Sequence, residues 1–187
     1  YMLKNPRSFD FFGSIVLVKF PKDTSLKEKK EFAIDLMNDN KSIKTVLEKS
    51  DKIKGRLRKM STKYIAGEKT KEVLYKENDC IFRFNIDDSY FSPRLSNERK
   101  EISDEIFKLS KGKKAKILVM FAGVAPYSIA IAKKNINCYI ISLEINKKAS
   151  KYAELNKKLN GLRNLEIVQG DVKKIIPKFI VDGEKFD

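Results

Sequence analysis

The sequence predicts an α/β fold whose second half contains a parallel, doubly wound sheet. Short apolar runs alternate there with amphipathic segments, and strands that alternate with helices are usually parallel and joined by crossovers. The predicted strands lie near 116–121, 137–143 and 165–169, and the predicted helices near 127–134 and 147–159. The chain has 187 residues, 42% of them hydrophobic, which is enough to bury a sizeable core.

The first half of the chain predicts a smaller α/β or α+β module. Residues 14–20, SIVLVKF, have the composition of a buried strand, and the apolar residues spaced among charges in 25–38 favour a helix. The apolar residues within 43–47 suggest a second short helix. From 56 to 86 the pattern changes to short β-like runs, notably EVLYKE and CIFRFNI.

A helix is predicted to follow this module. Ser92 and Pro93 suit a helix start, because serine caps a first turn and proline is tolerated within it. The helix is expected to continue to about Leu109. Its predicted apolar stripe consists of Leu95, Ile102, Ile106 and Leu109.

Composition limits the possible functions. The chain has 40 Lys and Arg against 25 Asp and Glu, a net charge of +15 that suits a polyanion such as nucleic acid. A lysine-biased genome or a hot habitat would also produce this charge. The absence of histidine excludes imidazole chemistry, and Cys80 and Cys138 are too distant in sequence to suggest a metal pair. No apolar run is long enough to span a membrane, so we expect a cytoplasmic protein. From the histidine and cysteine content we expect no metal site.

The junction at 117–132, ILVMFAGVAPYSIAIA, has the pattern of a ligand-binding loop. A strand runs into a turn at Gly123 and Pro126 and then into a helix, whose N-terminus offers amides to a ligand. Glu144 closes the following strand, where an acid can accept hydrogen bonds from ribose hydroxyls. The fingerprint G-x-G-x-x-G is absent, which disfavours a dehydrogenase. The layout resembles the cofactor cradle of class I S-adenosylmethionine (SAM) methyltransferases, although a βαβ unit without a ligand would also produce it.

Two further acidic residues are candidates for such a site. Asp171, in VQGDV, could accept a hydrogen bond from an adenine amino group beside Gly170, or it could equally cap the next helix. Glu98 lies at the margin of the predicted apolar stripe, where partial desolvation would raise its pKa and make it a better proton acceptor. From the residues alone, a surface ion pair with Arg94 or Arg99 is the favoured interpretation of Glu98.

Aromatic and basic residues near this helix are candidates for RNA contact. Tyr90 and Phe91 stand close to arginines, and aromatics can stack an unpaired base while cations hold its phosphates. Packing of both rings under the helix is the favoured alternative. Arg56, Arg58 and Lys59 form a second basic strip, which would otherwise be a solvated strand face.

Four segments taken together resemble the archaeal and eukaryotic-type tRNA (guanine-37-N1)-methyltransferases and the related enzymes that build wyosine bases at the same nucleotide. They are GRLRKM at 55–60, YKENDCIFRFNI at 75–86, YFSPRLSNERKEI at 90–102 and FAGVAPYSI at 121–129. The specific motif among them is YFSPRLSNER. The resemblance implies SAM as the cofactor and tRNA as the partner of a monomeric enzyme.

The resemblance also implies a division of the chain. A small α/β or α+β RNA-facing domain at 1–88 would be followed by a linking helix at 89–111. A Rossmann-like class I SAM methyltransferase domain would occupy 112–187. We expect this last domain to be incomplete, because a doubly wound sheet needs more strands, and the family's Asn-Leu-Pro segment would follow Asp187. The family's first small domain, which contacts the outer corner of tRNA, is expected to precede the chain.

Individual roles follow from the same resemblance. Glu98 would be the general base that accepts the guanine N1 proton, and Arg58 would stabilise charge on the purine oxygen. Tyr90, Arg94 and Arg99 would position the nucleotide. The residues expected to bind the cofactor are Phe121, Ala122, Gly123, Val124, Pro126, Glu144 and Asp171.

Two departures from the family pattern leave alternatives open. Val119 stands where the family usually has an acid, and Ala125 stands where it has a second glycine. A non-catalytic RNA-binding relative, whose altered loop no longer holds SAM, is therefore one alternative. The other is a wyosine-pathway enzyme that transfers either a methyl group or the aminocarboxypropyl arm of SAM.

Overall fold

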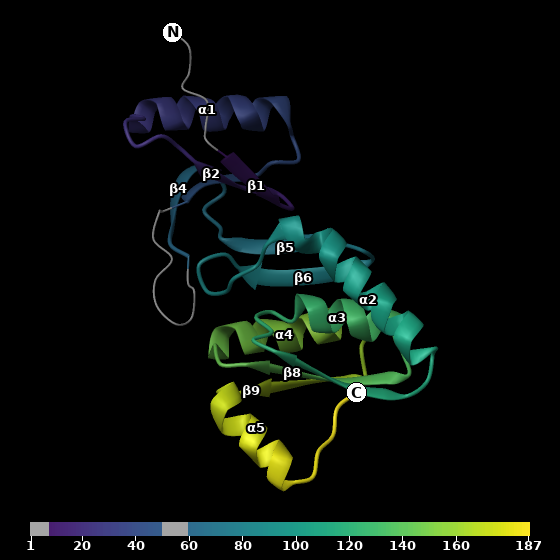
Figure 1. The fold of residues 1–187 in the computed structure, drawn as a ribbon. Coiled ribbons are helices and arrows are strands. Elements are labelled where there is room, and N and C mark those ends of the chain that lie inside the picture. Colours follow the sequence, from purple (N-terminus) through teal and green to yellow (C-terminus); the bar gives the residue numbers. More distant parts are fainter. Residues whose placement is uncertain (1–7, 50–59) are drawn as a thin grey trace.

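The computed structural model describes residues 8–49 and 60–187. Within these residues the chain forms three successive sheets with helices between and beside them (Figure 1). A four-stranded sheet comes first, a two-stranded hairpin second and a three-stranded parallel sheet last. The prediction of an α/β fold with a parallel sheet in the second half is confirmed.

The first sheet is mixed and has the order β1-β2-β3-β4. Its strands are β1 (Ser8–Phe12), β2 (Ile15–Lys19), β3 (Thr45–Lys49) and β4 (Thr62–Gly67). The parallel strands β2 and β3 are connected by helix α1 (Leu26–Asp39), which begins at a capping box formed by Ser25 and Glu28. The predicted strand at 14–20 and the predicted helix at 25–38 are confirmed by β2 and α1.

Two features of this sheet differ from the sequence predictions. Strand β1 is not predicted. Residues 43–47 are predicted as a short helix, but 45–47 belong to strand β3 instead. Their spacing fits one face of a helix, but Thr45 and Val46 are β-branched and suit a strand. Pairing with β2 buries Val46 and Leu47 completely. Burial on both faces of the sheet therefore outweighs the local periodicity.

A hairpin links the first sheet to the C-terminal part of the chain. Its strands, β5 (Glu72–Glu77) and β6 (Cys80–Asn85), lie where EVLYKE and CIFRFNI predict them. The turn residues Asn78 and Asp79 have positive φ values of 45° and 60°. Two successive positive φ values are what a tight two-residue hairpin turn requires, and Asn and Asp tolerate them.

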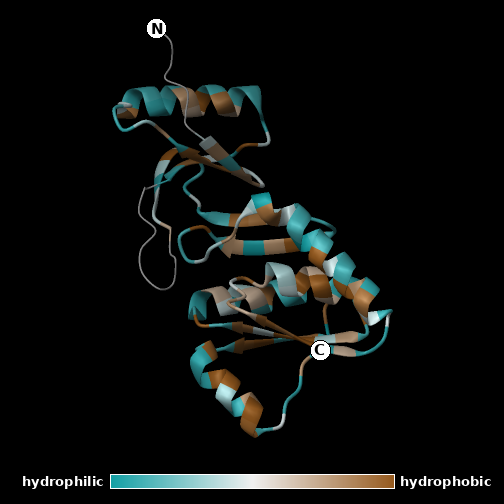
Figure 2. Cartoon of the chain, in the orientation of Figure 1, coloured by the Kyte–Doolittle hydropathy of each residue, from teal (hydrophilic) through white to brown (hydrophobic). Residues whose placement is uncertain are grey.

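Buried side chains form a continuous core across the three sheets. One cluster begins at Phe12 in the first sheet, includes Phe82 and Phe84 of the hairpin, and continues to Ile140 in the last sheet. A second cluster fills the space between α1 and the other face of the first sheet. Figure 2 shows hydrophobic and hydrophilic residues alternating along α1, as expected for a helix with one buried face. The first sheet is therefore buried on both faces.

The last sheet has the order β7-β8-β9, and all its strands are parallel. The strands are β7 (Ala115–Met120), β8 (Cys138–Glu144) and β9 (Leu165–Gln169), and the helices are α3 (Pro126–Lys134), α4 (Lys147–Leu159) and α5 (Val172–Val181). Figure 1 shows α3 and α4 between the hairpin and this sheet, and α5 on the other side of the sheet. The predicted strands and helices of this half are confirmed.

Helix α2 (Ser96–Ser110) follows a 3-10 turn at Pro93–Leu95 and contacts α3. The predicted helix is confirmed, but its predicted apolar stripe is only partly right, because Leu95 and Ile106 are half-buried while Ile102 and Leu109 are exposed. Ile102 is 37% exposed and Leu109 is 74% exposed, whereas Arg99 and Ser103 are buried. The buried face of α2 is therefore partly polar. None of the helices within the described residues is long and apolar enough to cross a membrane.

Two asparagines, Asn156 within α4 and Asn160 at its C-cap, hydrogen-bond to the backbone of β6. Asn160 accepts from the Ile81 amide at 2.9 Å and donates to the Ile81 carbonyl at 2.7 Å. Asn156 accepts from the Arg83 amide at 2.6 Å. An asparagine side chain carries both a donor and an acceptor. It can therefore make the two hydrogen bonds that the backbone of a neighbouring strand would otherwise make. These bonds attach the hairpin to α4.

Candidate active site

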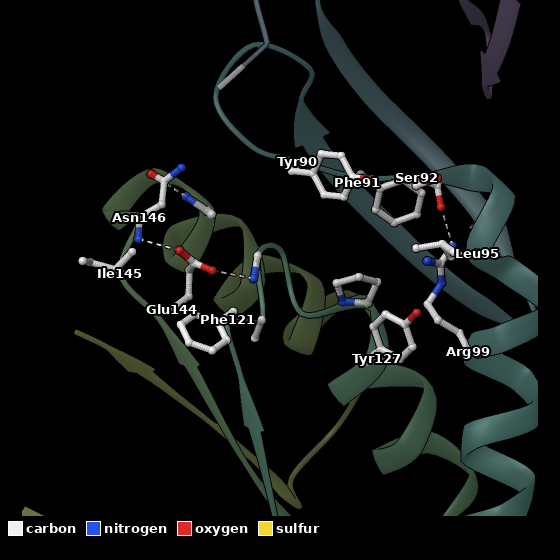
Figure 3. Close-up of a pocket in the computed structure, with 14 residues that line it drawn as sticks. Tyr90, Phe91, Ser92, Leu95, Arg99, Phe121, Tyr127, Glu144, Ile145 and Asn146 are labelled. Atoms are coloured by element: carbon white, nitrogen blue, oxygen red, sulfur yellow. Dashed lines mark hydrogen bonds between the residues drawn. The ribbon is translucent and has the colours of Figure 1, made fainter. Parts of the chain in front are cut away.

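A cavity of about 460 Å³ lies where β7 and β8 end, beside the segment that leads into α2 (Figure 3). Ligands of open α/β folds bind at the carboxyl ends of parallel strands, and the volume is in the range of about 300–1,000 Å³ typical of ligand pockets. One side, here called the loop wall, consists of Phe121, Ala122, Gly123, Glu144, Ile145 and Asn146. The other side, the helix wall, consists of Tyr90, Phe91, Ser92, Leu95, Arg99 and Tyr127.

Glu144 organises the loop wall through backbone amides. One carboxylate oxygen accepts from the Gly123 amide at 2.7 Å, and the other accepts from the Asn146 amide at 2.7 Å (Figure 3). Gly123 has a φ of +58°, which glycine adopts without strain. Each carboxylate oxygen keeps a further lone pair, so Glu144 can still accept hydrogen bonds from a ligand.

Exposed aromatic rings flank the cavity on both walls. Phe121 is 75% exposed, although its φ of +59° places it in the left-handed region, which costs an L-residue about 1–2 kcal/mol. Strained residues of this kind cluster at ligand sites. Tyr90 is 44% exposed and lies on the opposite wall (Figure 3). Either ring can stack on a planar ligand group.

The loop keeps its turn despite the alanine at its second glycine position. Ala125 is buried with a φ of +64°, and its amide donates to the Ala122 carbonyl at 2.9 Å. Alanine therefore adopts the left-handed conformation here, at a cost of about 1–2 kcal/mol. Val119, at the position where the family usually has an acid, packs against the core. Val124 is fully buried and does not line the cavity, whereas Pro126 does.

Glu98 is connected to the helix wall by Tyr127. The Tyr127 hydroxyl donates a 2.6 Å hydrogen bond to Glu98 Oε1. Burial of Tyr127, together with this bond, raises the pKa of its hydroxyl to about 12, so the hydroxyl remains a donor at neutral pH. The expected desolvation of Glu98 by an apolar stripe is wrong, because Glu98 is exposed on α2. A hydroxyl partner, not burial, holds this carboxylate.

Arg99 is buried inside the helix wall. It is 1% exposed and forms a two-pronged ion pair with Glu77, in which Nη2 donates to Oε2 at 2.7 Å. Nη2 also donates to the Ser92 carbonyl at 3.0 Å, and the guanidinium lies 4.9 Å from the centre of the Phe91 ring. The surface pair with Glu98 that the sequence favoured is therefore wrong for Arg99. Its charge instead fixes the segment that leads into α2.

The other predicted RNA-contacting residues separate into exposed and buried groups. Arg94 is exposed and pairs with Asp10 of β1 at 2.7 Å. Both aromatic residues line the cavity, but Phe91 is buried and stacks on Phe84 with ring centres 4.7 Å apart, whereas Tyr90 is exposed. Arg58, with the rest of the predicted basic strip, lies outside the described residues.

Asp171 lies at the start of α5 and does not line the cavity. Its carboxylate accepts from the Lys173 amide at 3.1 Å, as a helix cap does. A side chain at Gly170 would meet Ile175 at 3.0 Å, so close packing with this isoleucine accounts for the glycine. The capping interpretation is observed, and the cofactor-binding interpretation stays a prediction.

Several residues of the site are not predicted from the sequence, among them Tyr127, Glu77 and Asn146. Tyr127 and Glu77 are 29 and 22 residues from their respective partners, and no local pattern connects them. Asn146 carries a weak signal, because an asparagine directly after a strand often caps the next helix, and here it caps α4.

The chemistry of the loop wall fits SAM. A ribose presents two neighbouring hydroxyl donors, and Glu144 offers one remaining acceptor position on each oxygen. Phe121 and Ile145 supply apolar contact for a purine ring. Among the described residues, no group of three or more Cys, Asp and Glu side chains is placed to hold a metal ion.

Comparisons with known proteins identify related families for both parts of the chain. Residues 73–183 match the family described as TRM5/TYW2 methyltransferase domain, and residues 1–70 match the TYW2 N-terminal domain. Taw22 of Nanoarchaeum equitans (strain Kin4-M), a tRNA (guanine(37)-N(1))/4-demethylwyosine(37)-methyltransferase, is 40% identical over 164 residues. That alignment covers 88% of this chain and 52% of Taw22.

Solved structures agree with these matches. The complex of aTrm5 and tRNALeu is similar with a TM-score of 0.76 at 29% identity, covering 94% of this chain and 55% of that one. Methanocaldococcus jannaschii Trm5 in complex with adenosine gives a TM-score of 0.73 at 28% identity. The match covers 95% of this chain and 56% of that one. The chain spans about half the length of the curated relatives it matches. The family match over residues 73–183, more than half of the chain, shows that this chain belongs to the TRM5/TYW2 methyltransferase family.

Proposed function

We propose that the protein transfers a methyl group from SAM to N1 of guanosine 37 in tRNA. The observation that carries the proposal is that one pocket is lined by the carboxylate of Glu144 on one wall and, on the other, by Tyr127, whose hydroxyl binds the carboxylate of Glu98. Glu144 stands on the loop wall, and Glu98 is held at the helix wall by Tyr127. The nucleotide is suggested by the name of the relative Taw22, and tRNA also by the structural neighbour that is a complex of aTrm5 with tRNALeu.

The loop wall would hold the cofactor. Glu144 would accept from the ribose hydroxyls, while Phe121, Ala122 and Gly123 would line the cavity along the ligand. When bound, SAM supplies an electrophilic methyl group on its sulfonium. The remaining proposed contributors are Val124 and Pro126, which shape the turn before α3, and Asp171 at the start of α5.

The helix wall would prepare the guanine. N1 is weakly acidic and becomes a good nucleophile when it loses its proton, which Glu98 would accept. Tyr127 would orient the Glu98 carboxylate through its 2.6 Å bond. Arg58 is proposed, from the family resemblance alone, to stabilise negative charge on the purine oxygen.

Three residues would position the nucleotide in different ways. Tyr90 has an exposed ring at the cavity and would stack on a base. Arg94 has an exposed guanidinium, which would contact a phosphate and exchange its bond to Asp10. Arg99 would act indirectly, because its donors already engage Glu77 and Ser92. We expect the protein to do this as a monomer in the cytoplasm.

A methylation assay tests the proposal. The full-length protein is incubated with SAM and an unmodified tRNA transcript, and nucleosides are identified by mass spectrometry. We expect 1-methylguanosine from a transcript with guanosine 37 and none from a matched transcript with adenosine 37. The variant Glu98→Gln should lower turnover by about 10²-fold or more while SAM affinity stays the same. A wild-type protein that binds both SAM and tRNA without methyl transfer would contradict the proposal.

A second substrate is favoured by one specific finding. The name of the 40% identical Taw22 includes 4-demethylwyosine at position 37 beside guanine. We therefore infer that the same site also accepts 4-demethylwyosine. The assay is repeated with tRNA that carries this base, and a mass increase of one methyl group is expected. An aminocarboxypropyl adduct would instead assign a different transfer reaction.

A further inference from the structure

A groove of about 240 Å³ lies on the first sheet and shares no residue with the cavity of the candidate active site. Its charged lining residues are five lysines and one acid, Lys19, Lys22, Lys29, Lys49, Lys63 and Glu48. We name these residues the lysine groove. The buried ring of Phe20 also lines it, with the Lys29 ammonium 5.6 Å from the ring centre.

The order of the strands explains why these lysines meet. Lys19 and Lys49 are the last residues of β2 and β3, which are parallel and therefore end at the same side of the sheet. Lys63 lies near the start of β4, which is antiparallel to β3 and pairs it opposite Glu48. The topology of the sheet thus concentrates positive charge at one end.

Most of this charge is not neutralised within the described residues. Lys29 pairs with Glu48 at 2.6 Å, and their side chains are only 16% and 17% exposed. Lys22, Lys49 and Lys63 form no salt bridge in the part of the chain that the structure describes. Like charges gathered at one surface repel one another and disfavour folding unless an anion binds between them.

In the view of Figure 1, the elements that carry the lysine groove and the active-site cavity reach the same side of the molecule. Figure 1 shows the start of β4 and the C-terminal ends of β8 and β9 on the same, left-hand side of the molecule. The cavity lies at the C-terminal ends of the last sheet. A single polyanion could therefore cover the lysine groove and still present a nucleotide to the cavity.

We propose that the lysine groove binds the phosphate backbone of the RNA substrate. This inference rests on the proposed function for the identity of the RNA as tRNA. Ammonium groups attract phosphates as point charges without reading bases, so the contact supplies affinity and orientation but no sequence preference. The base at the cavity is selected separately, by the helix wall.

A salt-dependence experiment tests the lysine groove. The affinity of the full-length protein for a tRNA transcript is measured at several salt concentrations, for the wild type and for the triple variant Lys22→Gln, Lys49→Gln, Lys63→Gln. Each lost phosphate contact lowers the slope of log affinity against log salt by about 0.7–0.9, so a decrease of about 2 is expected. SAM affinity and turnover at saturating tRNA should remain those of the wild type, while the KM for tRNA rises.

Two further variants distinguish a local site from net charge. The triple variant Lys108→Gln, Lys113→Gln, Lys114→Gln removes the same charge from exposed positions at the other end of the last sheet, and its slope should change by less than about 1. Glu48→Gln releases Lys29 from its pair and should tighten tRNA binding. Thermal unfolding of each variant verifies that it is folded.

The outcomes separate this inference from the proposed function. If both triple variants lose the same slope and affinity, the lysine groove is not a binding site, while methylation of guanosine 37 by the wild type still stands. If the wild type transfers no methyl group but only the groove variant loses RNA affinity, the lysine groove stands and the proposed function fails.

Discussion

The two walls of the cavity are held in place by different kinds of contact. On the loop wall, the carboxylate of Glu144 accepts hydrogen bonds from two backbone amides, those of Gly123 and Asn146. On the helix wall, side chains hold side chains, in the pairs Arg99 with Glu77 and Tyr127 with Glu98. A wall built from backbone tolerates a departure such as Ala125, whereas a wall built from side chains depends on each partner.

The largest expected effect is on the helix wall. Arg99→Met leaves the buried Glu77 carboxylate without its cation, which should lower the free energy of unfolding by about 3–5 kcal/mol. Arg94→Met serves as the control, because its pair with Asp10 is exposed on the arginine side and should be worth about 0–1 kcal/mol. Urea denaturation measures both. Equal, small losses would show that α2 keeps its place without the buried pair.

The next effect concerns the loop wall. Glu144→Gln replaces one acceptor with an amide donor facing a backbone N–H, and it removes the negative charge from the ribose position. Hydrogen bonds to charged groups are worth about 1.5–3 kcal/mol, so the Kd for SAM should rise about 10- to 150-fold. Calorimetry compares it with Glu166→Gln, an exposed acid on the same sheet. An unchanged Kd would remove Glu144 from the cofactor site.

A smaller effect is expected from one hydroxyl. Tyr127→Phe frees the Glu98 carboxylate. Because Glu98 is exposed to water, this bond is worth only about 0.5–1.5 kcal/mol net, so turnover should fall about two- to tenfold with SAM affinity unchanged. Tyr139→Phe is a matched control. Tyr139 donates a hydrogen bond of 2.8 Å to the carboxylate of Glu166, and neither residue lines the cavity. The pH dependence of turnover should shift only in Tyr127→Phe. Identical profiles for the two variants would assign Tyr127 a structural role.

The smallest effect separates strain from contact at Phe121. Phe121→Gly removes about 1–2 kcal/mol of left-handed strain and adds about 0.4–1 kcal/mol of unfolded-chain entropy, so stability should rise by about 0.5–1 kcal/mol. Phe121→Ala keeps the strain and should not stabilise the protein. Both variants should bind SAM more weakly, because both lose the exposed ring. A Phe121→Gly variant with full SAM affinity would show that the ring does not contact the cofactor.

The regular second half of the fold is predictable from the sequence, and the irregular first half is less so. Strands β7 to β9 are apolar runs whose helices carry their own start signals, so local pattern suffices there. At 43–47, however, helix and strand periodicities fit equally well, and the choice depends on pairing with β2, about thirty residues earlier. Strand β1 is missed because Phe9 and Phe11 are exposed and only Phe12 is buried.

The two walls of the site differ in the same respect. Gly123 and Glu144 occupy positions that a strand, a turn and the next strand define, so spacing alone identifies them. The contacts of Glu98 and Arg99 are set by Tyr127 and Glu77, which lie far away in sequence. A hydrophobicity pattern also cannot reveal that a charged arginine occupies the buried face of α2. Local sequence signals predict the helix itself, but only the family motif connects Glu98 and Arg99 with the site.

Asn156 of α4 and the C-cap residue Asn160 cover an edge strand of the hairpin that would otherwise be open to other copies of the chain. Unpaired backbone groups on an outer strand are templates for aggregation. One helical step of four residues rises about 6 Å, close to the about 6.8 Å spanned by two strand residues, so Asn156 and Asn160 reach Arg83 and Ile81 together. A slip of one residue would break both contacts. Side chains of a helix thus protect β6 from intermolecular strand addition and lock its alignment.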